Sequence, residues 1–259
     1  MKIATFNVNS IRSRLHIVIP WLEKKSPEFL CMQETRVGDD KFPEDKFQEI
    51  GYNVVYSGNQ KGRNGVAIAT KEKPEKITKG FNTKPYEKDR ILTAKFEHIT
   101  VINTYIPQGY KINSNKYRYK LDWFDRFKNY LEENYLMNDF LVWGGDMNVA
   151  PLDIDVHSPK RLKNHVCFHQ DVKEKFEDVK KLGFIDLFRE YHHGEKNQYT
   201  FYDYRTKEPM ERNIGWRVDH ILGTEKVKSK SINSYIDIEP RRKEKPSDHT
   251  PLIFEMQKL

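Results

Sequence analysis

The chain contains the stretch Asp139-Phe140-Leu141-Val142-Trp143-Gly144-Gly145-Asp146-Met147-Asn148-Val149, in which an apolar run leads into two glycines and then into Asp-x-Asn. The apolar run has the length of a buried strand, and the glycines permit a turn or a ligand approach that a Cβ would block. Side chains alternate along an extended chain, so Asp146 and Asn148 lie on the same side. Such polar groups are suited to a phosphate, its attacking water and a metal. The alternative is a strand-end turn in which both side chains bond the local backbone.

The same arrangement, an apolar run followed by a polar or acidic group, recurs at five strand ends or loops. The groups concerned are Asn7 with Asn9, Glu34, Asp146 with Asn148, Asp219, and Asp248 with His249. Carboxylates that gather at one end of a sheet repel one another, and a cation offsets this repulsion. The pattern therefore predicts that these side chains converge around one divalent ion.

Each of these groups also has a simpler interpretation when it is taken alone. Asn7 fits a satisfied turn amide, and a lone Glu34 is more often an exposed acid, because acids are rarely buried. Asp219 interrupts an apolar strand, and a buried aspartate needs a partner. His249 is either that partner or a core histidine bonded to the backbone, and its segment also fits a turn before the last strand.

The hydrophobic patterns predict strands and helices that are interspersed through both halves of the chain. The predicted strands cover residues 2–9, 29–32, 51–57, 65–70, 91–96, 100–106, 139–143, 199–204, 217–222, 231–237 and 250–255. The predicted helices cover 15–25, which Pro20 would kink or restart, 114–136, and 169–182. The basic residues of the long helix are expected on a solvated face. Together these elements predict an α/β sandwich of two sheets with helices outside, formed by residues 1–259 as a single domain.

The composition is that of a basic chain with ordinary hydrophobicity. The 259 residues are 37% hydrophobic, which is typical of a soluble globular protein with a substantial core. No run approaches the ~20 apolar residues of a membrane span, and no signal segment follows Met1, so a cytoplasmic location is expected. The net charge of +7 favours a polyanionic partner without establishing one. Cys31 and Cys167 match no zinc or redox spacing, which favours reduced core residues.

Eight segments carry a further signal when they are read in order. They are Asn7-Val8-Asn9-Ser10-Ile11-Arg12, Gln33-Glu34, Lys61-Gly62-Arg63-Asn64-Gly65-Val66-Ala67, Tyr105-Ile106-Pro107-Gln108-Gly109, Gly145-Asp146-Met147-Asn148-Val149-Ala150, Tyr204-Arg205, Trp216-Arg217-Val218-Asp219 and Ser247-Asp248-His249. This series resembles the motifs of the exonuclease III-type abasic-site endonucleases, within the endonuclease/exonuclease/phosphatase superfamily. Each motif alone is weak, but the ordered set covers nearly the whole chain. The resemblance implies a DNase I-like α/β (α+β) fold, a four-layer sandwich of two packed mixed β-sheets flanked by helices.

The resemblance also implies metal-assisted hydrolysis of a phosphodiester, with water attacking phosphorus in line with the leaving 3′ oxygen. It assigns Glu34 as the main metal ligand, with Asn7 and Asp248 near the ion. Hard oxygen ligands, without a Cys/His cluster, favour Mg²⁺, with Mn²⁺ as a substitute, over zinc. The catalytic residues that it assigns are Tyr105, Asp146, Asn148, Asp219 and His249.

Each of these catalytic residues has an expected role. Asp146 would orient and deprotonate the attacking water, and Asn148 would hold the phosphate or that water. His249 would donate to the phosphoryl oxygens, while Asp219 would fix the tautomer of His249 and favour the imidazolium. Tyr105 would place its hydroxyl on a phosphate oxygen or near the leaving group.

The implied partner is duplex DNA that contains abasic sites or blocked 3′ ends. An abasic deoxyribose rotates out of the duplex at little cost, since no base must be unstacked. Phe201, Trp216 and Val218 would line its pocket, although they equally fit a core. The other candidate DNA contacts are Asn9, Arg12, Lys61, Arg63, Gln108, Lys111, Arg205 and Arg217. Asn64 replaces an aromatic that is more frequent in relatives, and Lys111 lies in a variable loop, so the balance between endonuclease and exonuclease activity stays open.

The resemblance therefore predicts a monomeric DNA repair nuclease that cleaves 5′ to an abasic site, with 3′→5′ exonuclease and 3′-end phosphodiesterase side activities. Two other functions stay open at this point. One is a non-specific DNase or an inositol-phosphate or lipid phosphodiesterase of the same fold, and the basic balance weighs against the lipid versions. The other is a catalytically silent DNA-binding scaffold, against which the retention of every polar strand end argues.

Overall fold

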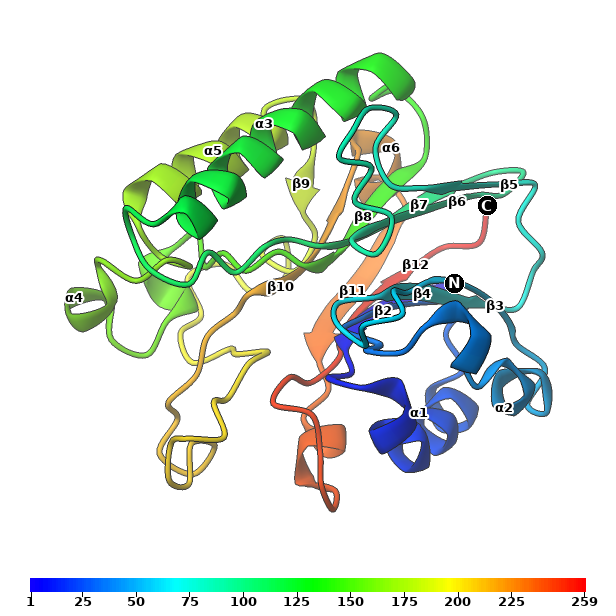
Figure 1. The fold of residues 1–259 in the computed structure, drawn as a ribbon, viewed down its shortest axis with the longest axis horizontal. Coiled ribbons are helices and arrows are strands. Elements are labelled where there is room, and N and C mark those ends of the chain that lie inside the picture. Colours follow the sequence, from blue (N-terminus) through cyan, green and yellow to red (C-terminus); the bar gives the residue numbers. More distant parts are fainter.

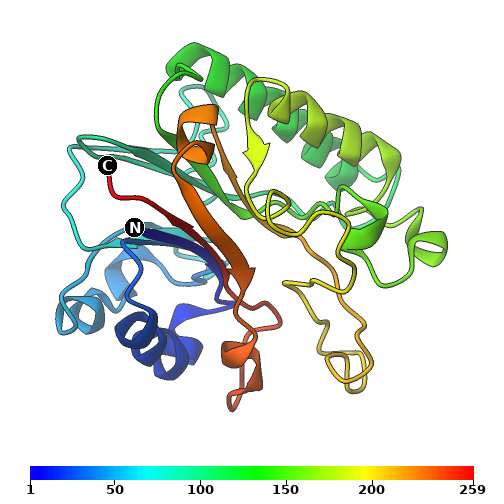
Figure 2. The same ribbon diagram turned by 180° about the vertical axis from the view of Figure 1, so that it is seen from behind.

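The computed structural model describes residues 1–259 and contains two mixed six-stranded sheets (Figures 1 and 2). The first sheet consists, in spatial order, of β11 (Ser231–Ile236), β12 (Leu252–Met256), β1 (Lys2–Asn7), β2 (Phe29–Gln33), β4 (Val66–Thr70) and β3 (Asn53–Ser57). The second consists of β5 (Lys76–Lys79), β6 (Ile91–Lys95), β7 (Thr100–Tyr105), β8 (Leu141–Asp146), β10 (Asp219–Gly223) and β9 (Ile185–Asp186). The predicted sandwich of two mixed sheets is confirmed.

The two sheets have the same pattern of strand directions. In each sheet one parallel pair lies at the centre, β1 with β2 and β7 with β8, and every other neighbouring pair is antiparallel. Parallel strands deliver their carboxyl ends to the same edge of a sheet. The first sheet therefore presents Asn7 and Glu34 together, and the second presents Tyr105 and Asp146.

The central strands are buried on both faces, which explains their continuous apolar runs. Ile3, Cys31 and Val142 point between the sheets and belong to one cluster of 18 buried residues that joins both sheets. Ala4 and Trp143 point outward, and each belongs to a separate cluster between its sheet and the covering helices. The structure thus has four layers, with three apolar interfaces between them.

Helices cover the outer face of each sheet (Figure 1). On the first sheet they are α1 (Ile11–Lys25) and α2 (Glu44–Gln48), and on the second α3 (Asn115–Asn134) and α5 (Gln170–Lys180). Ser114 caps α3 by accepting from the backbone N–H of Tyr117 at 3.2 Å. The remaining helical elements are α4 (Pro159–Leu162), α6 (Glu225–Lys228) and the 3₁₀ turns η1 (Asp39–Lys41), η2 (Asp153–Asp155) and η3 (Glu239–Arg242). None of the helices has both the length and the apolar character needed to cross a membrane.

Two predicted elements differ from the structure, and two edge strands were not predicted. The first helix begins at Ile11, four residues before the predicted start, and continues through Pro20. The predicted strand 199–204 does not form, because Phe201 makes only isolated bridges, one to Trp216 and one to His249. This segment therefore connects the approaches to the two sheets and extends neither of them. The edge strands β5 and β9 escaped prediction because they are short, with four and two residues, and carry no buried apolar run.

Candidate active site

A pocket opens at the edge where the central strands of both sheets end. Most of the predicted site residues line it, namely Glu34, Tyr105, Gln108, Asp146, Asn148, Phe201, Arg205, Trp216, Val218, Asp248 and His249. Three further lining residues were not predicted: His165, Cys167 and Asp203. Side chains from residue 34 to residue 249 therefore converge on one hollow, whereas Asn7, Asn9 and Asp219 of the recurring polar groups do not line it.

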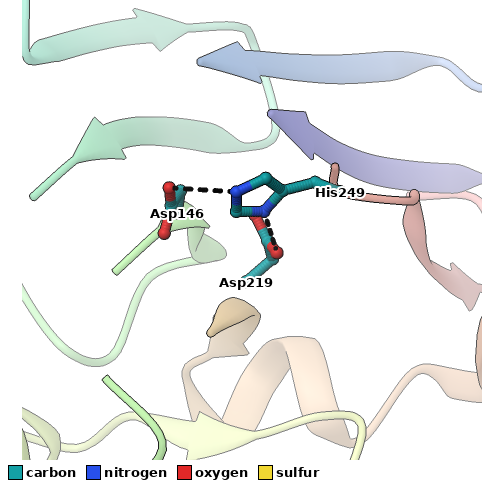
Figure 3. A group of neighbouring side chains, drawn as sticks. All are labelled: Asp146, Asp219 and His249. Carbon is teal, nitrogen blue, oxygen red and sulfur yellow. Dashed lines mark hydrogen bonds and ion pairs between the residues drawn. The ribbon is translucent and has the colours of Figure 1, made fainter. Parts of the chain in front are cut away.

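Two carboxylates and one imidazole form the centre of the site (Figure 3). Asp146 ends β8 and is the direct register partner of Asp219, the first residue of β10, so strand pairing itself brings the two acids together. His249 lies between them, with Nδ1 at 2.8 Å from Oδ2 of Asp219 and Nε2 at 3.9 Å from Oδ2 of Asp146. All three residues are buried. Asp219 is thus bonded to His249, as the resemblance implied, whereas the residues alone had left a core histidine as the alternative.

The charges of this cluster are unequal. Burial raises the pKa of Asp146 to about 7, with Asp219 and Glu34 adding to the effect and His249 and Asn7 opposing it. Burial alone would lower the pKa of His249, but Asp219 and Asp146 outweigh it and raise that pKa to about 10. At neutral pH the imidazole is therefore a cation, whereas Asp146 lies close to its midpoint and can release or accept a proton.

Asn7 links the two sheets at the site. Its Nδ2 donates to Oε1 of Glu34 at 2.9 Å and to Oδ2 of Asp146 at 2.8 Å, while its Oδ1 accepts from the backbone N–H of Asn9 at 3.0 Å. The carboxamide oxygen is therefore engaged by the backbone. Asn7 is thus a donor between two acids, and its expected position near the ion stays a prediction. Asn9 in turn donates through Nδ2 to Asp248 at 2.8 Å.

Glu34 carries a partner that the sequence analysis missed. Arg36 donates from Nε to Oε2 of Glu34 at 2.8 Å. Burial would raise the pKa of Glu34, but Arg36 and the hydrogen bond from Asn7 outweigh it, so the net pKa is lowered. Glu34 is therefore an anion at neutral pH, with Oε1 accepting from Asn7 and Oε2 accepting from Nε and Nη2 of Arg36. The spacing of an extended chain does not explain this contact, because the backbone is left-handed at both residues, with φ of 50° at Glu34 and 51° at Arg36.

Three site residues have left-handed backbone conformations that side chains other than glycine seldom adopt. The φ angles are 44° at Asn9, 50° at Glu34 and 49° at Asn148. Such strain, at about 1–3 kcal/mol for each residue, persists where the surroundings determine the conformation, and it gathers at functional sites. Asn148 is fixed by its own N–H, which donates to Oδ1 of Asp146 at 3.0 Å, and by Nδ2, which donates to the Ile106 carbonyl at 3.0 Å. The local turn that was the simpler interpretation of Asp146 is present, and it positions the site.

Lys120 is an unexpected member of the site region. The long helix α3 was expected to expose its basic residues, but Lys120 is fully buried. Its Nζ donates to the carbonyls of Gln108 at 3.2 Å, Asn148 at 2.6 Å and Val166 at 2.8 Å. Burial lowers the pKa of this amine. Lys120 thus holds three loops that surround the pocket, a role that no local sequence pattern indicates.

One wall of the pocket is apolar. Trp216 and Val218, 9% and 4% exposed, line it and also belong to a small buried cluster of eight residues, so both interpretations of these side chains apply. The ring centroid of His165 lies 4.5 Å from that of Trp216, and burial lowers the pKa of His165 to about 4, which keeps it neutral. Phe201 lies with its ring centroid 4.9 Å from that of His249. This wall can accept an apolar group beside the charged cluster.

The predicted DNA contacts divide into three groups. Gln108 is exposed at the pocket, and the 90% exposed side chain of Arg205 lies at its mouth, paired with Asp203 at 2.6 Å. Four residues are exposed but do not line the pocket: Arg12, Lys61, Arg63 and Lys111. Arg217 is different, because its side chain is fully buried and forms ion pairs with Asp155 and Asp186. The prediction that Arg217 contacts phosphate is therefore wrong.

The donor set of the site fits a hard divalent cation. Glu34 and Asp248 both present carboxylates to the pocket. Asp146 and Asp219 each place a carboxylate oxygen within 4.8 Å of the other, and Oδ1 of Asp219 is buried without a hydrogen-bond partner. His249 lies beside them, but as a cation it is not a metal ligand. The pKa of Asp146 is raised mainly by burial, with Asp219 and Glu34 adding to the effect, and a nearby cation would stabilise the ionised carboxylate. Oxygen atoms predominate in this set, as Mg²⁺ and Mn²⁺ prefer.

Several known proteins are similar to this chain in sequence. The model of the endonuclease/exonuclease/phosphatase family matches residues 4–249. Exodeoxyribonuclease III of Haemophilus influenzae is 33% identical over 99% of this chain and 100% of its own length. The DNA-(apurinic or apyrimidinic site) endonuclease of Dictyostelium discoideum is 31% identical over 97% of this chain and 69% of its own length.

Solved structures agree with these sequence relationships. An AP endonuclease from Archaeoglobus fulgidus superposes with a TM-score of 0.97 at 54% identity, and the match covers 100% of both chains. A 3′-5′ exonuclease from Neisseria meningitidis superposes with a TM-score of 0.94 at 34% identity, also over 100% of both chains. The chain belongs to the endonuclease/exonuclease/phosphatase family, within its group of exodeoxyribonuclease III-type and AP endonuclease enzymes.

Proposed function

We propose that this chain is a monomeric DNA repair nuclease that hydrolyses the phosphodiester 5′ to an abasic site in duplex DNA with the help of Mg²⁺. Side activities at 3′ ends, exonucleolytic and phosphodiesterase, use the same site. The observation that carries the proposal is the position of the apolar wall of Trp216 and Val218 directly beside the buried cluster of Asp146, Asp219 and His249. A flipped deoxyribose without a base fits against the apolar wall, and its 5′ phosphate would then lie at the buried cluster.

Side chains of this protein supply the base and most of the hydrogen-bond donors that the reaction requires. Asp146, with a pKa near 7, takes a proton from the attacking water. His249 is cationic at neutral pH and donates from Nε2 to a phosphoryl oxygen, and Asp219 holds its Nδ1. Asn148 keeps its carboxamide near the attacking water or the phosphate, while the Tyr105 hydroxyl lies at the leaving side. Burial raises the pKa of Tyr105 well above its usual value, so this hydroxyl remains a donor.

Glu34 and Asp248, which both line the pocket, would hold the divalent ion. When bound, it would supply Lewis-acid stabilisation of the negative charge that develops on the phosphate oxygens. Arg36 keeps Glu34 ionised, and Asn7 orients it. These contacts prepare the carboxylate for a cation without a change of its protonation.

Phosphate contacts outside the pocket are proposed for the exposed basic residues. Arg12, Lys61, Arg63 and Lys111 would contribute affinity without sequence preference, and so would Arg205 once DNA competes with Asp203. Asn9 and Gln108 would act closer to the pocket. The net charge of +7 supports such a surface.

The test is a cleavage assay on two otherwise identical labelled duplexes, one with a single abasic site and one without. We expect incision at the abasic position only, in the presence of Mg²⁺, and none after EDTA. Equal cleavage of both duplexes would instead identify a non-specific nuclease, and tight DNA binding without any Mg²⁺-dependent incision would identify a scaffold.

A metal titration tests the ligand assignment separately. Glu34→Ala is expected to raise the Mg²⁺ concentration for half-maximal activity by at least about 10–100-fold, since even indirect partners of a metal have effects of that size. Glu75→Ala, at an exposed position outside the pocket, is the control. An unchanged titration in the Glu34 variant would show that this carboxylate is structural.

A further inference from the structure

The loop that follows Asp146 is held by a side chain that the proposed mechanism does not use. His220 is fully buried, and its Nε2 lies 2.7 Å from the carbonyl of Val149, the residue next to Asn148. The amides on either side are also fixed, because Met147 donates to the Val218 carbonyl at 3.0 Å and Ala150 donates to the Cys167 carbonyl at 2.7 Å. His220 therefore supplies the donor that the Val149 carbonyl needs in a buried position.

The tautomer of His220 is set by Arg217. Nδ1 of His220 lies 3.0 Å from Nη1 of Arg217, and a guanidinium can only donate, so Nδ1 accepts and the proton resides on Nε2. Burial, assisted by the charge of Arg217, lowers the pKa of His220 to about 4 and keeps the ring neutral. The donation from Nε2 to Val149 is thus a consequence of the contact with Arg217.

Arg217 is in turn fixed by two carboxylates from other elements. Its Nε and Nη2 donate to Asp155 in η2 at 2.7 and 3.2 Å, and Nη1 and Nη2 donate to Asp186 in β9 at 3.2 and 2.8 Å. Arg189 also pairs with Asp155. A buried ion pair is weak evidence for stability on its own, because a well-packed apolar replacement is often as stable. The orientation that the pair imposes is a more informative property.

The same arginine stands between two residues of the pocket wall. Trp216 and Val218 line the pocket, whereas Arg217 is directed to the opposite side, as alternation along an extended segment requires. The backbone N–H of Arg217 also donates to the Asp155 carbonyl at 2.8 Å. One buried network thus contacts both the apolar wall and, through His220, the loop that carries Asn148.

We propose that Arg217 and His220 are positioning residues, which hold the Asn148 loop and the wall of Trp216 and Val218 in register with Asp146. They touch neither substrate nor metal, and they act through the backbone carbonyl of Val149 and through the strand that carries the wall. The part of this inference that concerns substrate discrimination rests on the proposed function. The part that concerns the loop holds for any reaction at this site.

The experiment compares His220→Phe, which removes both ring contacts, with His220→Gln, whose carboxamide retains a donor for Val149. The control is Trp21→Phe, which removes a buried 2.9 Å hydrogen bond to Asp237 on the first sheet. Each variant is measured for thermal midpoint, for kcat on the abasic duplex well below that midpoint, and for amide hydrogen exchange at Met147 and Ala150.

We expect His220→Phe to lower kcat by about 100-fold, because a displacement of 1 Å has effects of that size, and to speed exchange at Met147 and Ala150. His220→Gln should retain most of the wild-type kcat and most of the slow exchange at Met147 and Ala150. Trp21→Phe should lower the thermal midpoint and leave kcat and exchange at these two amides unchanged. Unchanged kcat and exchange in His220→Phe would overturn the proposal and leave a purely structural network.

Arg217→Lys provides a second test of the positioning role if His220→Phe does not fold. Lysine keeps the charge but lacks the planar fork that reaches Asp155, Asp186 and His220 together. It should speed the exchange of Met147 and Ala150 and reduce the preference for abasic over intact duplex. Unchanged exchange in this variant would overturn the proposal. A wild-type chain that fails to cut the abasic duplex would defeat the proposed function alone, since the exchange measurement needs no turnover.

Discussion

Two buried clusters in this molecule have nearly the same composition and opposite electrostatic behaviour. In one, His249 lies between Asp146 and Asp219, and in the other, Arg217 lies between Asp155 and Asp186. The pKa of Asp146 is raised to about 7. The pKa of Asp186 is instead lowered to about 2, and that of Asp155 is lowered as well. Two aspartates around a central cation therefore make either a reactive site or an inert ion-pair network, in which Arg189 is a second cation at Asp155.

The difference follows from the shape of the cation. A guanidinium has five donors in one plane, and Arg217 uses them to satisfy both carboxylates at once. An imidazolium has only two donors, on opposite sides of its ring. His249 bonds Oδ2 of Asp219 at 2.8 Å, but its Nε2 lies 3.9 Å from Asp146. The oxygens of Asp146 accept only from the neutral donors Asn7 Nδ2 and Asn148 N–H, so no cation is hydrogen-bonded to this carboxylate. An incompletely paired carboxylate is what a general base requires.

The largest expected effect comes from breaking the reactive cluster. Asp146→Asn should reduce turnover of the abasic duplex by about 10²–10⁴-fold, because an amide cannot take a proton from water. Binding of the duplex should survive, and the free energy of unfolding should stay equal or rise, since burial already disfavours the ionised carboxylate. Single-turnover kinetics, fluorescence anisotropy and thermal unfolding measure the three quantities. Near-normal turnover would remove the assignment of Asp146 as the base.

The inert cluster should respond in the opposite manner. Asp155→Ala leaves Arg217 and Arg189 buried without one of their carboxylates, so the free energy of unfolding should fall by about 3–5 kcal/mol. Denaturant unfolding measures this loss. Asp153→Ala, at an exposed residue of the same turn, should change it little. If Asp155→Ala were as stable as the wild type, the comparison between the two clusters would lose its basis.

The pH dependence of activity sharpens the comparison further. The base must be deprotonated and His249 must be protonated, so kcat/KM should rise about tenfold per unit toward a plateau above pH 7 and fall near pH 10. A bound divalent cation stabilises the carboxylate, so the acid limb should move to lower pH as the Mg²⁺ concentration rises. Rates measured from pH 5 to pH 11 at two Mg²⁺ concentrations test both statements. If the midpoint of the acid limb does not change with the Mg²⁺ concentration, Asp146 does not interact with the ion.

The smallest effect concerns stability in acid. The folded pKa of Asp186 is about 2 against an ordinary value of 3.8, so its ion pair stabilises the fold above about pH 4 and loses this contribution as pH falls toward 2. The contribution amounts to about 2 kcal/mol. Asp186→Asn should therefore flatten the acid limb of a stability curve, whereas Asp178→Asn, at an ion pair on the surface of α5, should not. Parallel acid limbs in the wild type and Asp186→Asn would contradict this assignment.

The groups whose positions at strand ends could be predicted are those with an informative local sequence. Asp146 and Glu34 follow apolar runs, and a buried strand must end where its apolar residues end. Asp219 could be suspected of having a partner because it interrupts such a run. Parallel pairing places Asn7 beside Glu34 and Tyr105 beside Asp146, whereas antiparallel pairing of β8 with β10 places Asp219 beside Asp146. Local patterns therefore located the individual groups, and the packing of the two sheets brings them together.

The residues that the sequence misplaced depend on distant contacts. Arg217 belongs to a motif that also contains pocket residues, and nothing near it reveals Asp155, 62 positions away, or Asp186, 31 positions away. Lys120 has the spacing of an exposed helical lysine, and only the three carbonyls that surround it explain its burial. Long-range pairing of this kind leaves no periodic trace in the chain.

The segment around Phe201 has a consequence for thermal inactivation. Its backbone exchanges hydrogen bonds with Trp216, on the approach to one sheet, and Tyr202 and Thr200 bond the backbone of Asp248 and Thr250, on the approach to the other. Any sliding between the two halves would have to break these bonds and the substrate hollow together. The enzyme should therefore lose its activity at the temperature where it loses its tertiary structure, with no intervening range in which a folded but inactive form persists.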